Sequence, residues 1–501
     1  MSNPGATDYD VLIIGAGPAG SLAAAQLERE GFRLLVVEKQ IFPRFVIGES
    51  MLPSSMGLLE GAGLLDPIEK QGFMKKYGAV FFRGNQTCNF DFANQSSAGF
   101  KYTYQVTRAD FDKTLADTVA ARGVEILYGH SVTNVSFGND RATATLEEPA
   151  SGEHSTHQPH TENPKGIPPQ SPGLPSLRGY PGIETSELHN PKGVAPNGAM
   201  SVHGAGRGER FIEKSPEAKQ RNVTARFVLD CSGYGRVLPR LLKLEEPSTF
   251  PPRESLFAHV NGDIRPEGRE EGKIWVCIHP GGAWIWIIPF SNGRTSVGVV
   301  GDPDFFRNFP EEPEARLREI IMSDPNAAAR LKGMKIVFPP QRIAGFACSV
   351  KTVYGPRSNS AAVPDRSNSS ESTQFALVGN ATEFLDPVFS SGVALALESA
   401  QRAVQVLTRQ LRGETVDWQR EYADYIKQGI NTFRSYVSAW YDDKLPQIFF
   451  APRRDPEIMK QICSVLAGYV WDKSNLYVTQ ADRALSLLAR ISEGQSGAAA
   501  K

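Results

Sequence analysis

The sequence predicts an α/β protein with a parallel-sheet domain, an inserted region of mixed β-sheet and a C-terminal helical part. Three observations support this class. Residues 9–40 follow a strand–helix–strand pattern, strand-like runs return at 223–230, 274–300 and 375–380, and residues after 392 form amphipathic helical segments. The length of 501 residues exceeds one compact core, so we expect two or three structural units.

Composition excludes several classes of protein. The 54 Lys+Arg residues balance 55 Asp+Glu residues, which gives no basic field for nucleic acid or an anionic membrane. No apolar run approaches the roughly 20 residues of a membrane span, and the polar N-terminus "MSNPGATDYD" lacks a signal-peptide pattern. The five cysteines are scattered and have no metal-binding spacing. We therefore expect reduced thiols and a cytoplasmic location, with neither nucleic acid nor a membrane span.

The domain organisation follows from these runs and from two stretches rich in Pro, Gly and Ser. The stretches at 148–222 and 355–373 are typical of disordered or loop insertions. The first contains His154, His157 and His160, but nothing around them would fix a coordination geometry, so we predict no metal site. The predicted units are the first part of the parallel-sheet domain (1–250), a sheet-rich region (251–345), the return of the first domain (346–412) and a helical region (413–501).

The first strand–helix–strand unit carries a glycine-rich turn, "GAGPAG". Gly15 would make the tight turn, Gly17 would let the backbone approach a pyrophosphate, and Gly20 would let helix and strand pack closely. Ala19 lies in the same turn, at a helix N-terminus that favours an anion. Glu38 ends the next strand, where it would accept hydrogen bonds from ribose hydroxyls. An ordinary glycine-rich turn is the alternative. The glycine spacing, the preceding strand, the following helix and Glu38 together predict a Rossmann-like dinucleotide site.

Three distant segments indicate which dinucleotide binds. They are "QVTRADFDKTL" with Arg108, "VLDCSGYGR" with Asp230, and "FALVGNATEFLDP" with Gly379, Asn380 and Asp386. Together they resemble the FAD fold of the para-hydroxybenzoate hydroxylase superfamily, in which the last motif crosses the ribityl chain and pyrophosphate. The resemblance implies FAD. This sequence departs from the usual Gly-Asp pair by having Asn380, whose amide still forms hydrogen bonds but carries no charge.

The stretch "GGAWIWIIPF" narrows the range of possible activities. In a strand, Trp284, Trp286 and Ile288 would face one side and the intervening residues the other. Both sets are apolar, so the strand would be buried on both faces, and core packing alone could explain the pair. The pattern W-x-W-x-I-P nevertheless resembles flavin-dependent halogenases. That resemblance implies that Trp284 and Trp286 lie near the flavin and keep the organic substrate away from it.

A second stretch, "FLDPVFSSG", resembles the F-x-x-P-x-x-S-x-G pattern of phenol-type and pyrrole-type halogenases. Ser390, Ser391 and Gly392 precede a long predicted helix, and free backbone N–H groups at a helix N-terminus favour anions. The resemblance implies a chloride or bromide site at these three residues. Helix capping by serine is the alternative.

Two further stretches carry the same resemblance. In "GFMKKYGAVFF", Lys76 matches the family's catalytic lysine, with Lys75 as the second choice. Its ammonium could donate a hydrogen bond to hypohalous acid, or a desolvated amine of lowered pKa could become a haloamine. In "FPRFVIGESMLP", Arg44 and the Gly48–Glu49–Ser50 stretch would lie along the FAD.

The resemblance implies a flavin-dependent halogenase, with 251–345 as its substrate region and the helices of 413–501 covering the substrate. Such an enzyme would use FADH2, O2 and a halide ion to halogenate an electron-rich phenolic or pyrrolic substrate, by way of hypohalous acid. The chain has a single G-x-G-x-x-G unit, so we expect a separate NAD(P)H-dependent flavin reductase. The substrate could be free or tethered to an acyl carrier protein. An FAD-dependent aromatic monooxygenase, a prenyl reductase-like oxidoreductase and a flavin-binding protein without activity stay open as alternatives.

Overall fold

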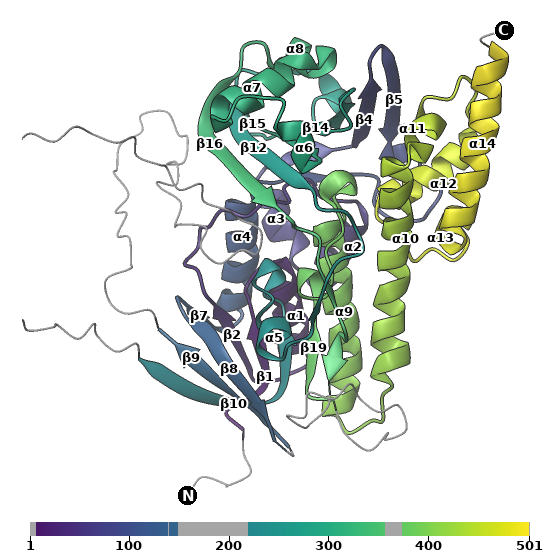
Figure 1. Ribbon diagram of the computed structural model, residues 1–501. Helices are drawn as coiled ribbons and strands as arrows, with labels where there is room; N and C mark the ends of the chain where they lie inside the picture. Colours follow the sequence, from purple (N-terminus) through teal and green to yellow (C-terminus); the bar gives the residue numbers. More distant parts are fainter. Residues whose placement is uncertain (1–6, 139, 149–218, 356–372, 500–501) are drawn as a thin grey trace, which may run out of the picture.

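The computed structural model describes residues 7–138, 140–148, 219–355 and 373–499 (Figure 1). Most of both predicted insertions, with the histidines at 154, 157 and 160, lies outside the described residues. All five cysteines are described and are free thiols. Among the described helices, none combines the length and apolar character needed to cross a membrane.

The first sheet has five parallel strands at its centre, in the order β19–β10–β1–β2–β7. Two antiparallel strands, β8 (Ser131–Phe137) and β9 (Ala142–Glu147), continue from β10, and β18 (Tyr354–Gly355) pairs with β19. The parallel strands are β1 (Tyr9–Ile14), β2 (Leu34–Glu38), β7 (Glu125–Tyr128), β10 (Gln220–Asp230) and β19 (Phe375–Leu377). This sheet confirms the predicted α/β class.

Alternation along β1 explains why both faces of this sheet are covered. Val11 and Ile13 join a core with α1 (Pro18–Arg29), α4 (Arg108–Ala121) and α9 (Ser391–Leu411). Leu12 and Ile14 point the other way, into a core shared with β8, β9 and α5 (Val237–Leu241). The sheet therefore separates a helical layer from a mostly β layer, with the carboxyl ends of its parallel strands at one edge.

The second sheet has seven strands in the order β16–β12–β15–β14–β13–β4–β5. Neighbours run antiparallel except β4 and β13. Its strands are β4 (Gly78–Arg83), β5 (Gln86–Asp91), β12 (Glu254–Asn261), β13 (Ile274–Ile278), β14 (Trp284–Pro289), β15 (Arg294–Gly301) and β16 (Lys335–Ala344). The sheet thus combines residues 254–344 with β4 and β5, which lie before the predicted boundary at 251.

Strand β14 is buried on both faces, as the sequence predicted. Trp284, Trp286 and Ile288 join the core formed with the C-terminal helices, whereas Ile285 and Ile287 pack with the helices on the opposite face. Those opposite helices are α6 (Pro303–Phe306), α7 (Pro313–Ser323) and α8 (Pro325–Leu331).

The C-terminal helices are α10 (Asp424–Tyr441), α11 (Lys444–Phe449), α12 (Pro456–Leu466), α13 (Leu476–Thr479) and α14 (Ala481–Ala499). They share a core with the second sheet, and α10 packs against α9, which lies between it and the first sheet (Figure 1). Short elements complete the chain: α2 (Ser54–Gly61), α3 (Leu65–Lys70), β3 (Met74–Lys76) paired with β6 (Thr103–Gln105), and β11 (Glu245–Glu246) paired with β17 (Ser349–Val350).

Candidate active site

The glycine-rich turn joins β1 to α1 as the motif predicted. A Cβ atom on Gly20 would lie 1.9 Å from the Gly15 carbonyl oxygen, so only glycine permits this close packing. A Cβ atom on Gly17 would instead meet Arg44 Nη2 at 3.4 Å. No side chain in the described part of the protein caps the N-terminus of α1. Free helix N–H groups and a guanidinium therefore lie beside the same turn.

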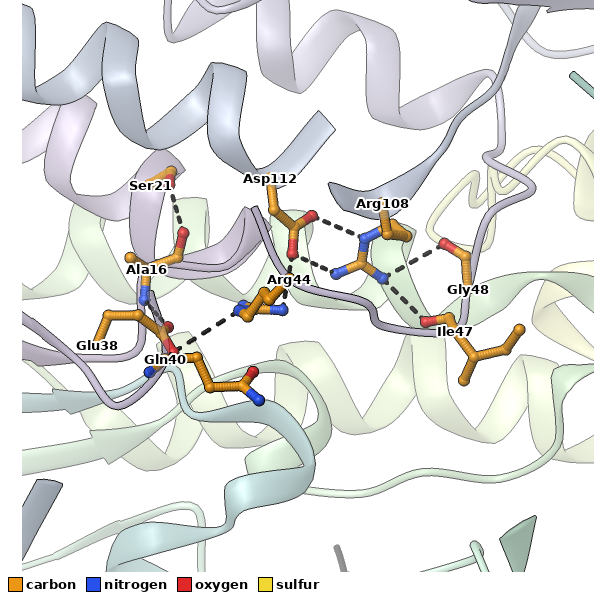
Figure 2. Close-up of polar contacts among 9 residues, drawn as sticks. All are labelled: Ala16, Ser21, Glu38, Gln40, Arg44, Ile47, Gly48, Arg108 and Asp112. Atoms are coloured by element: carbon orange, nitrogen blue, oxygen red, sulfur yellow. Dashed lines mark hydrogen bonds and ion pairs between the residues drawn. The ribbon is translucent and has the colours of Figure 1, made fainter. Parts of the chain in front are cut away.

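A chain of buried charges holds Arg44 at this position (Figure 2). Glu38 Oε2 accepts a hydrogen bond from the Ala16 N–H at 2.9 Å, and Glu38 Oε1 lies 3.7 Å from Arg44 Nε. Arg44 Nη1 lies 3.2 Å from Asp112 Oδ2, and Arg108 donates to both Asp112 oxygens at 2.7 and 2.9 Å. Asp112 was not among the predicted site residues, although its spacing of four residues from Arg108 on a helix was a usable signal.

This donor set fits a dinucleotide. Helix N–H groups and an arginine are the usual partners of a pyrophosphate, and a carboxylate at the end of β2 suits ribose hydroxyls. Ala19 lies buried in the first turn of α1, beside the same groups. The residues present are therefore compatible with the adenine dinucleotide part of FAD.

Two other predicted cofactor segments meet at the carboxyl ends of β10 and β19. Asp230 pairs with Leu377 across these strands. The Asp230 carboxylate accepts backbone hydrogen bonds from Ser232 at 2.9 Å and Leu238 at 2.7 Å, so it is already engaged in shaping its own turn. Burial raises the pKa of Asp230. Contact of Asp230 with a cofactor stays a prediction.

The turn at Gly379 and Asn380 lies against the start of α9. The Gly379 N–H donates to Ser399 Oγ at 2.9 Å, and a Cβ atom on Gly392 would lie 3.8 Å from Asn380 Oδ1. The folded chain thus brings together two motifs that the sequence predicted separately: the cofactor turn and the serine–glycine turn.

Helix α9 begins at Ser391, so Ser391 and Gly392 form its first turn instead of preceding it. Ser390 adopts φ 55° and ψ 27°, a left-handed conformation that costs a non-glycine residue roughly 1 kcal/mol. Its side chain makes no capping hydrogen bond within the described chain. Plain serine capping therefore does not explain this turn, and the first N–H groups of α9 keep their capacity to bind.

Lys76 is the last residue of β3 and is buried, with 2% exposure. Its Nζ donates to Ser50 Oγ at 2.8 Å and to the Met51 carbonyl at 2.9 Å, and lies 5.5 Å from the Phe92 ring centroid. Burial lowers the pKa of Lys76 from 10.5 to about 7. Lys75 is exposed and lies over the Tyr102 ring, so of these two lysines it is Lys76 that has the environment of a reactive amine.

A buried pair beside this lysine was not predicted. Glu49 Oε1 lies 2.7 Å from His259 Nε2, and three aromatic rings surround the imidazole. The neighbouring Ser50 is the partner of Lys76. The two members of the pair are 210 residues apart in sequence, and no local pattern connects them.

The two tryptophans are nearly covered, at 3% and 5% exposure, with ring centroids 5.9 Å apart. The Trp286 indole N–H donates to Ser296 Oγ at 3.0 Å, and that of Trp284 to the Tyr441 hydroxyl at 3.1 Å. The Trp286 ring lies over Gly298, where a Cβ atom would come within 2.3 Å of it. Both indoles are therefore fixed by packing and by a hydrogen bond.

Asp386 connects the tryptophans to the serine–glycine turn. Its Oδ1 accepts from the Val388 N–H at 2.9 Å, and its Oδ2 accepts from the Tyr441 hydroxyl at 2.7 Å. Burial raises the pKa of Asp386 from 3.8 to about 6. Asp386 was predicted as a cofactor residue, and the structure adds a contact to the tryptophan strand through Tyr441.

The predicted residues therefore fall into two adjoining groups. One group surrounds the glycine-rich turn and the strand ends beside it. The other follows the second sheet, where Lys76 lies two residues before β4 and the tryptophans lie on β14, two strands away. In the described ranges, no group of three His, Cys, Asp or Glu residues could hold a metal ion. The chemistry available is that of an amine, buried aromatic rings and anion-binding N–H groups.

Comparison with known proteins agrees with this arrangement. Residues 8–160 match an FAD binding domain, so the chain is a flavoprotein. The chain is 26% identical over 97% of its length to the 1H-pyrrole-2-carbonyl-[peptidyl-carrier protein] chlorinase of Pseudomonas fluorescens, and covers 94% of that protein. It is 25% identical to flavin-dependent halogenase gsfI of Penicillium aethiopicum, over 86% of this chain and 70% of that one.

Solved structures show the same fold. A flavoprotein/dehydrogenase from Cytophaga hutchinsonii superposes with a TM-score of 0.78 at 38% identity, over 97% of this chain and 99% of that one. The flavin-dependent brominase Bmp2 gives a TM-score of 0.70 at 22% identity, over 96% and 99%. Residues 187–473, more than half of the chain, match the tryptophan halogenase family. The chain therefore belongs to this family of flavin-dependent halogenases, oxidoreductases that act on aromatic substrates.

Proposed function

We propose that this enzyme halogenates an electron-rich phenolic or pyrrolic ring, using FADH2, O2 and chloride or bromide, with Lys76 as its catalytic residue. The observation that carries the proposal is the environment of the Lys76 amine, which is buried against a hydroxyl and a carbonyl and has a pKa of about 7. Burying an ammonium without a carboxylate costs several kcal/mol, which a purely structural lysine would avoid.

FAD would be held by residues 15–20, Glu38 and Arg44 at its dinucleotide part, and by Gly379 and Asn380 along its ribityl chain. Arg108 would act by fixing Arg44 through Asp112, and Asp230 and Ser50 would border the site. When bound and reduced, FAD supplies the two electrons that convert O2, a halide ion and a proton into hypohalous acid and water.

The halide would bind at Ser390, Ser391 and Gly392. The uncapped first turn of a 21-residue helix supports this, because its N–H groups and the helix dipole both favour an anion. The contact of this turn with Asn380 supports a position next to the cofactor.

Lys76 would receive the hypohalous acid. As a neutral amine it uses both N–H donors on Ser50 and Met51, which leaves its lone pair to attack the halogen. An N–halogen bond forms, an N–H proton leaves and water is released. The ring then takes the halogen, a carbon–halogen bond forms, and the ring proton is lost as the amine is restored. As an ammonium, Lys76 would instead donate its third N–H to hypohalous acid.

Trp284 and Trp286 would form a barrier between flavin and substrate. Their burial and hydrogen-bonded indoles support a rigid wall that admits a small acid and excludes an aromatic ring. Alanine at either position should let oxygenated products appear. Unchanged halogenation without oxygenation would favour simple core packing.

The substrate class rests on the F-x-x-P-x-x-S-x-G pattern and on the similarity to a chlorinase that acts on a pyrrole tethered to a carrier protein. Such a substrate could be free or attached to an acyl carrier protein. The single dinucleotide motif supports a separate NAD(P)H-dependent flavin reductase, and an NADH-fed reaction that runs equally well without one would exclude that partner.

A coupled assay tests the proposal. The full chain is supplied with FAD, NADH, a flavin reductase and bromide or chloride, then incubated with phenols, pyrroles and their carrier-bound thioesters. Mass spectrometry should find one added halogen per turnover. Products that gain oxygen would favour an aromatic monooxygenase, and a reduced prenyl double bond would favour a prenyl reductase-like enzyme. A protein that fails to bind FAD would favour a relative that has lost catalytic activity.

A further inference from the structure

A row of hydrogen bonds joins three segments that lie far apart in sequence. The Trp284 indole on β14 donates to the hydroxyl of Tyr441, the last residue of α10, at 3.1 Å. That hydroxyl donates to Asp386 Oδ2 at 2.7 Å, just before the serine–glycine turn. Asp386 is 2% exposed, so water does not compete freely for its carboxylate.

We propose that Tyr441 is a positioning residue that fixes the Trp284 indole against the cofactor-side turn. In doing so it sets the ratio of halogenated aromatic product to hydrogen peroxide that the enzyme releases. This inference rests on the proposed halogenase function and on the barrier formed by the tryptophans.

The direction of each hydrogen bond follows from the chemistry of the three groups. An indole N–H only donates, so the Tyr441 oxygen must accept from Trp284. The hydroxyl proton is then free to donate to the Asp386 carboxylate, which only accepts when ionised. Burial raises the pKa of Tyr441 and keeps this proton in place. A phenylalanine would break both bonds while keeping the ring.

The Tyr441 ring is held from its face as well as from its hydroxyl. The Arg253 guanidinium carbon lies 3.8 Å from the ring centroid, within cation–π range. Arg253 forms no ion pair with a described residue, and its positive charge favours the ionised form of the nearby Asp386. The guanidinium and the carboxylate therefore fix both the plane of the ring and the direction of its hydroxyl.

The same helix offers a matched control. Tyr436 is fully buried on α10, packs edge-on against Phe389 at 6.1 Å, and has a hydroxyl without a hydrogen-bond partner in the described chain. Tyr436→Phe therefore removes the same atom from the same helix without breaking a hydrogen bond. Any difference between the two variants reports the row of hydrogen bonds.

The test compares full-length wild type, Tyr441→Phe and Tyr436→Phe. Tyr441→Phe should alter the tryptophan bands of the near-ultraviolet circular dichroism spectrum of the FAD-free protein. In the coupled bromination assay it should lower the ratio of halogenated product to hydrogen peroxide about fivefold to tenfold, the size expected for losing an ordinary hydrogen bond. The FAD affinity of Tyr441→Phe should stay within about twofold of wild type. Tyr436→Phe should match wild type in the tryptophan bands, the product ratio and FAD affinity.

A Trp284→Phe background checks whether Tyr441 affects the product ratio through Trp284. There, adding Tyr441→Phe should change the product ratio no further, because Tyr441 acts through Trp284. The inference is overturned if Tyr441→Phe matches Tyr436→Phe in either the spectrum or the product ratio. A wild type that makes no halogenated product refutes the proposed function instead, and the spectra alone then decide whether Tyr441 fixes Trp284.

Discussion

Two regions of this protein bury positive charge in opposite ways. Beside the glycine-rich turn, Arg44 and Arg108 share the buried carboxylate of Asp112, with contacts of 2.7 to 3.2 Å. Beside the second sheet, Lys76 has only a hydroxyl and a carbonyl as hydrogen-bond partners, and no described carboxylate lies within ion-pair distance of its amine. The first arrangement keeps both arginines charged, whereas the second lets the protonation state of Lys76 change with pH.

The difference follows from the side chains and their partners. A guanidinium stays protonated and is stabilised further by a bidentate carboxylate. A buried ammonium without a counter-ion loses hydration and gains little in return, so its pKa falls, here to about 7. We infer that the first region serves binding and the second serves proton-dependent chemistry. The two regions should therefore respond differently to substitution.

Asp112→Ala should have the largest effect. It leaves the buried guanidinium of Arg108 without a carboxylate and leaves Arg44 with Glu38 alone. Breaking a buried ion pair by removing one partner typically costs about 3–5 kcal/mol of unfolding free energy. Urea denaturation measures the loss, and fluorescence titration should show weaker FAD binding as Arg44 moves. On the same helix, Lys113 and Asp117 form an exposed pair with the same four-residue spacing. Asp117→Ala should cost only about 0.3–0.5 kcal/mol, and equal losses would contradict the contrast.

Lys76→Met tests the other region. Halogenation should fall at least about 100-fold, the usual size for loss of a group that takes part in proton or halogen transfer. Product mass spectrometry follows the change, with the exposed neighbour Lys75→Met as the control that keeps activity. Loss of activity in Lys75→Met alone would move the role to that residue.

Stability gives a second measurement on Lys76→Met. Because the folded pKa of about 7 lies below the ordinary 10.5, the unfolded state of the wild type binds more protons between these values. The unfolding free energy of the wild type therefore rises with pH in this window, by up to about 1.4 kcal/mol per unit. The methionine variant should lack this rise.

The sequence predicted local features better than long-range pairs. The alternation of "WIWIIP" was enough to assign both faces of β14, because side chains in a strand alternate whatever surrounds them. The family pattern named Lys76, but only the fold shows that it is buried and Lys75 exposed. Trp284 and Tyr441 are 157 residues apart, and local spacing does not encode a contact of that range.

The pH dependence of halogenation tests which protonation state of Lys76 acts. With a pKa of about 7, the neutral fraction of Lys76 rises from about one tenth at pH 6 to about nine tenths at pH 8. If the amine carries the halogen, the single-turnover rate should rise about tenfold from pH 6 to a plateau above pH 8. A rate that falls over this range would assign the task to the ammonium. Lys76→Arg, which stays charged throughout, should be inactive in the first case.

Ser50→Ala should have the smallest effect, a shift in the midpoint of that profile. The hydroxyl accepts a hydrogen bond from Lys76, and such a bond stabilises an ammonium more than an amine. Its removal should lower the pKa of Lys76 by about 0.5–1 unit, so the rate profile moves to lower pH. Ser55→Ala is the control, because its buried hydroxyl has no partner in the described chain. A midpoint that stays or rises in Ser50→Ala would mean that burial alone, without this hydroxyl, sets the protonation of the amine.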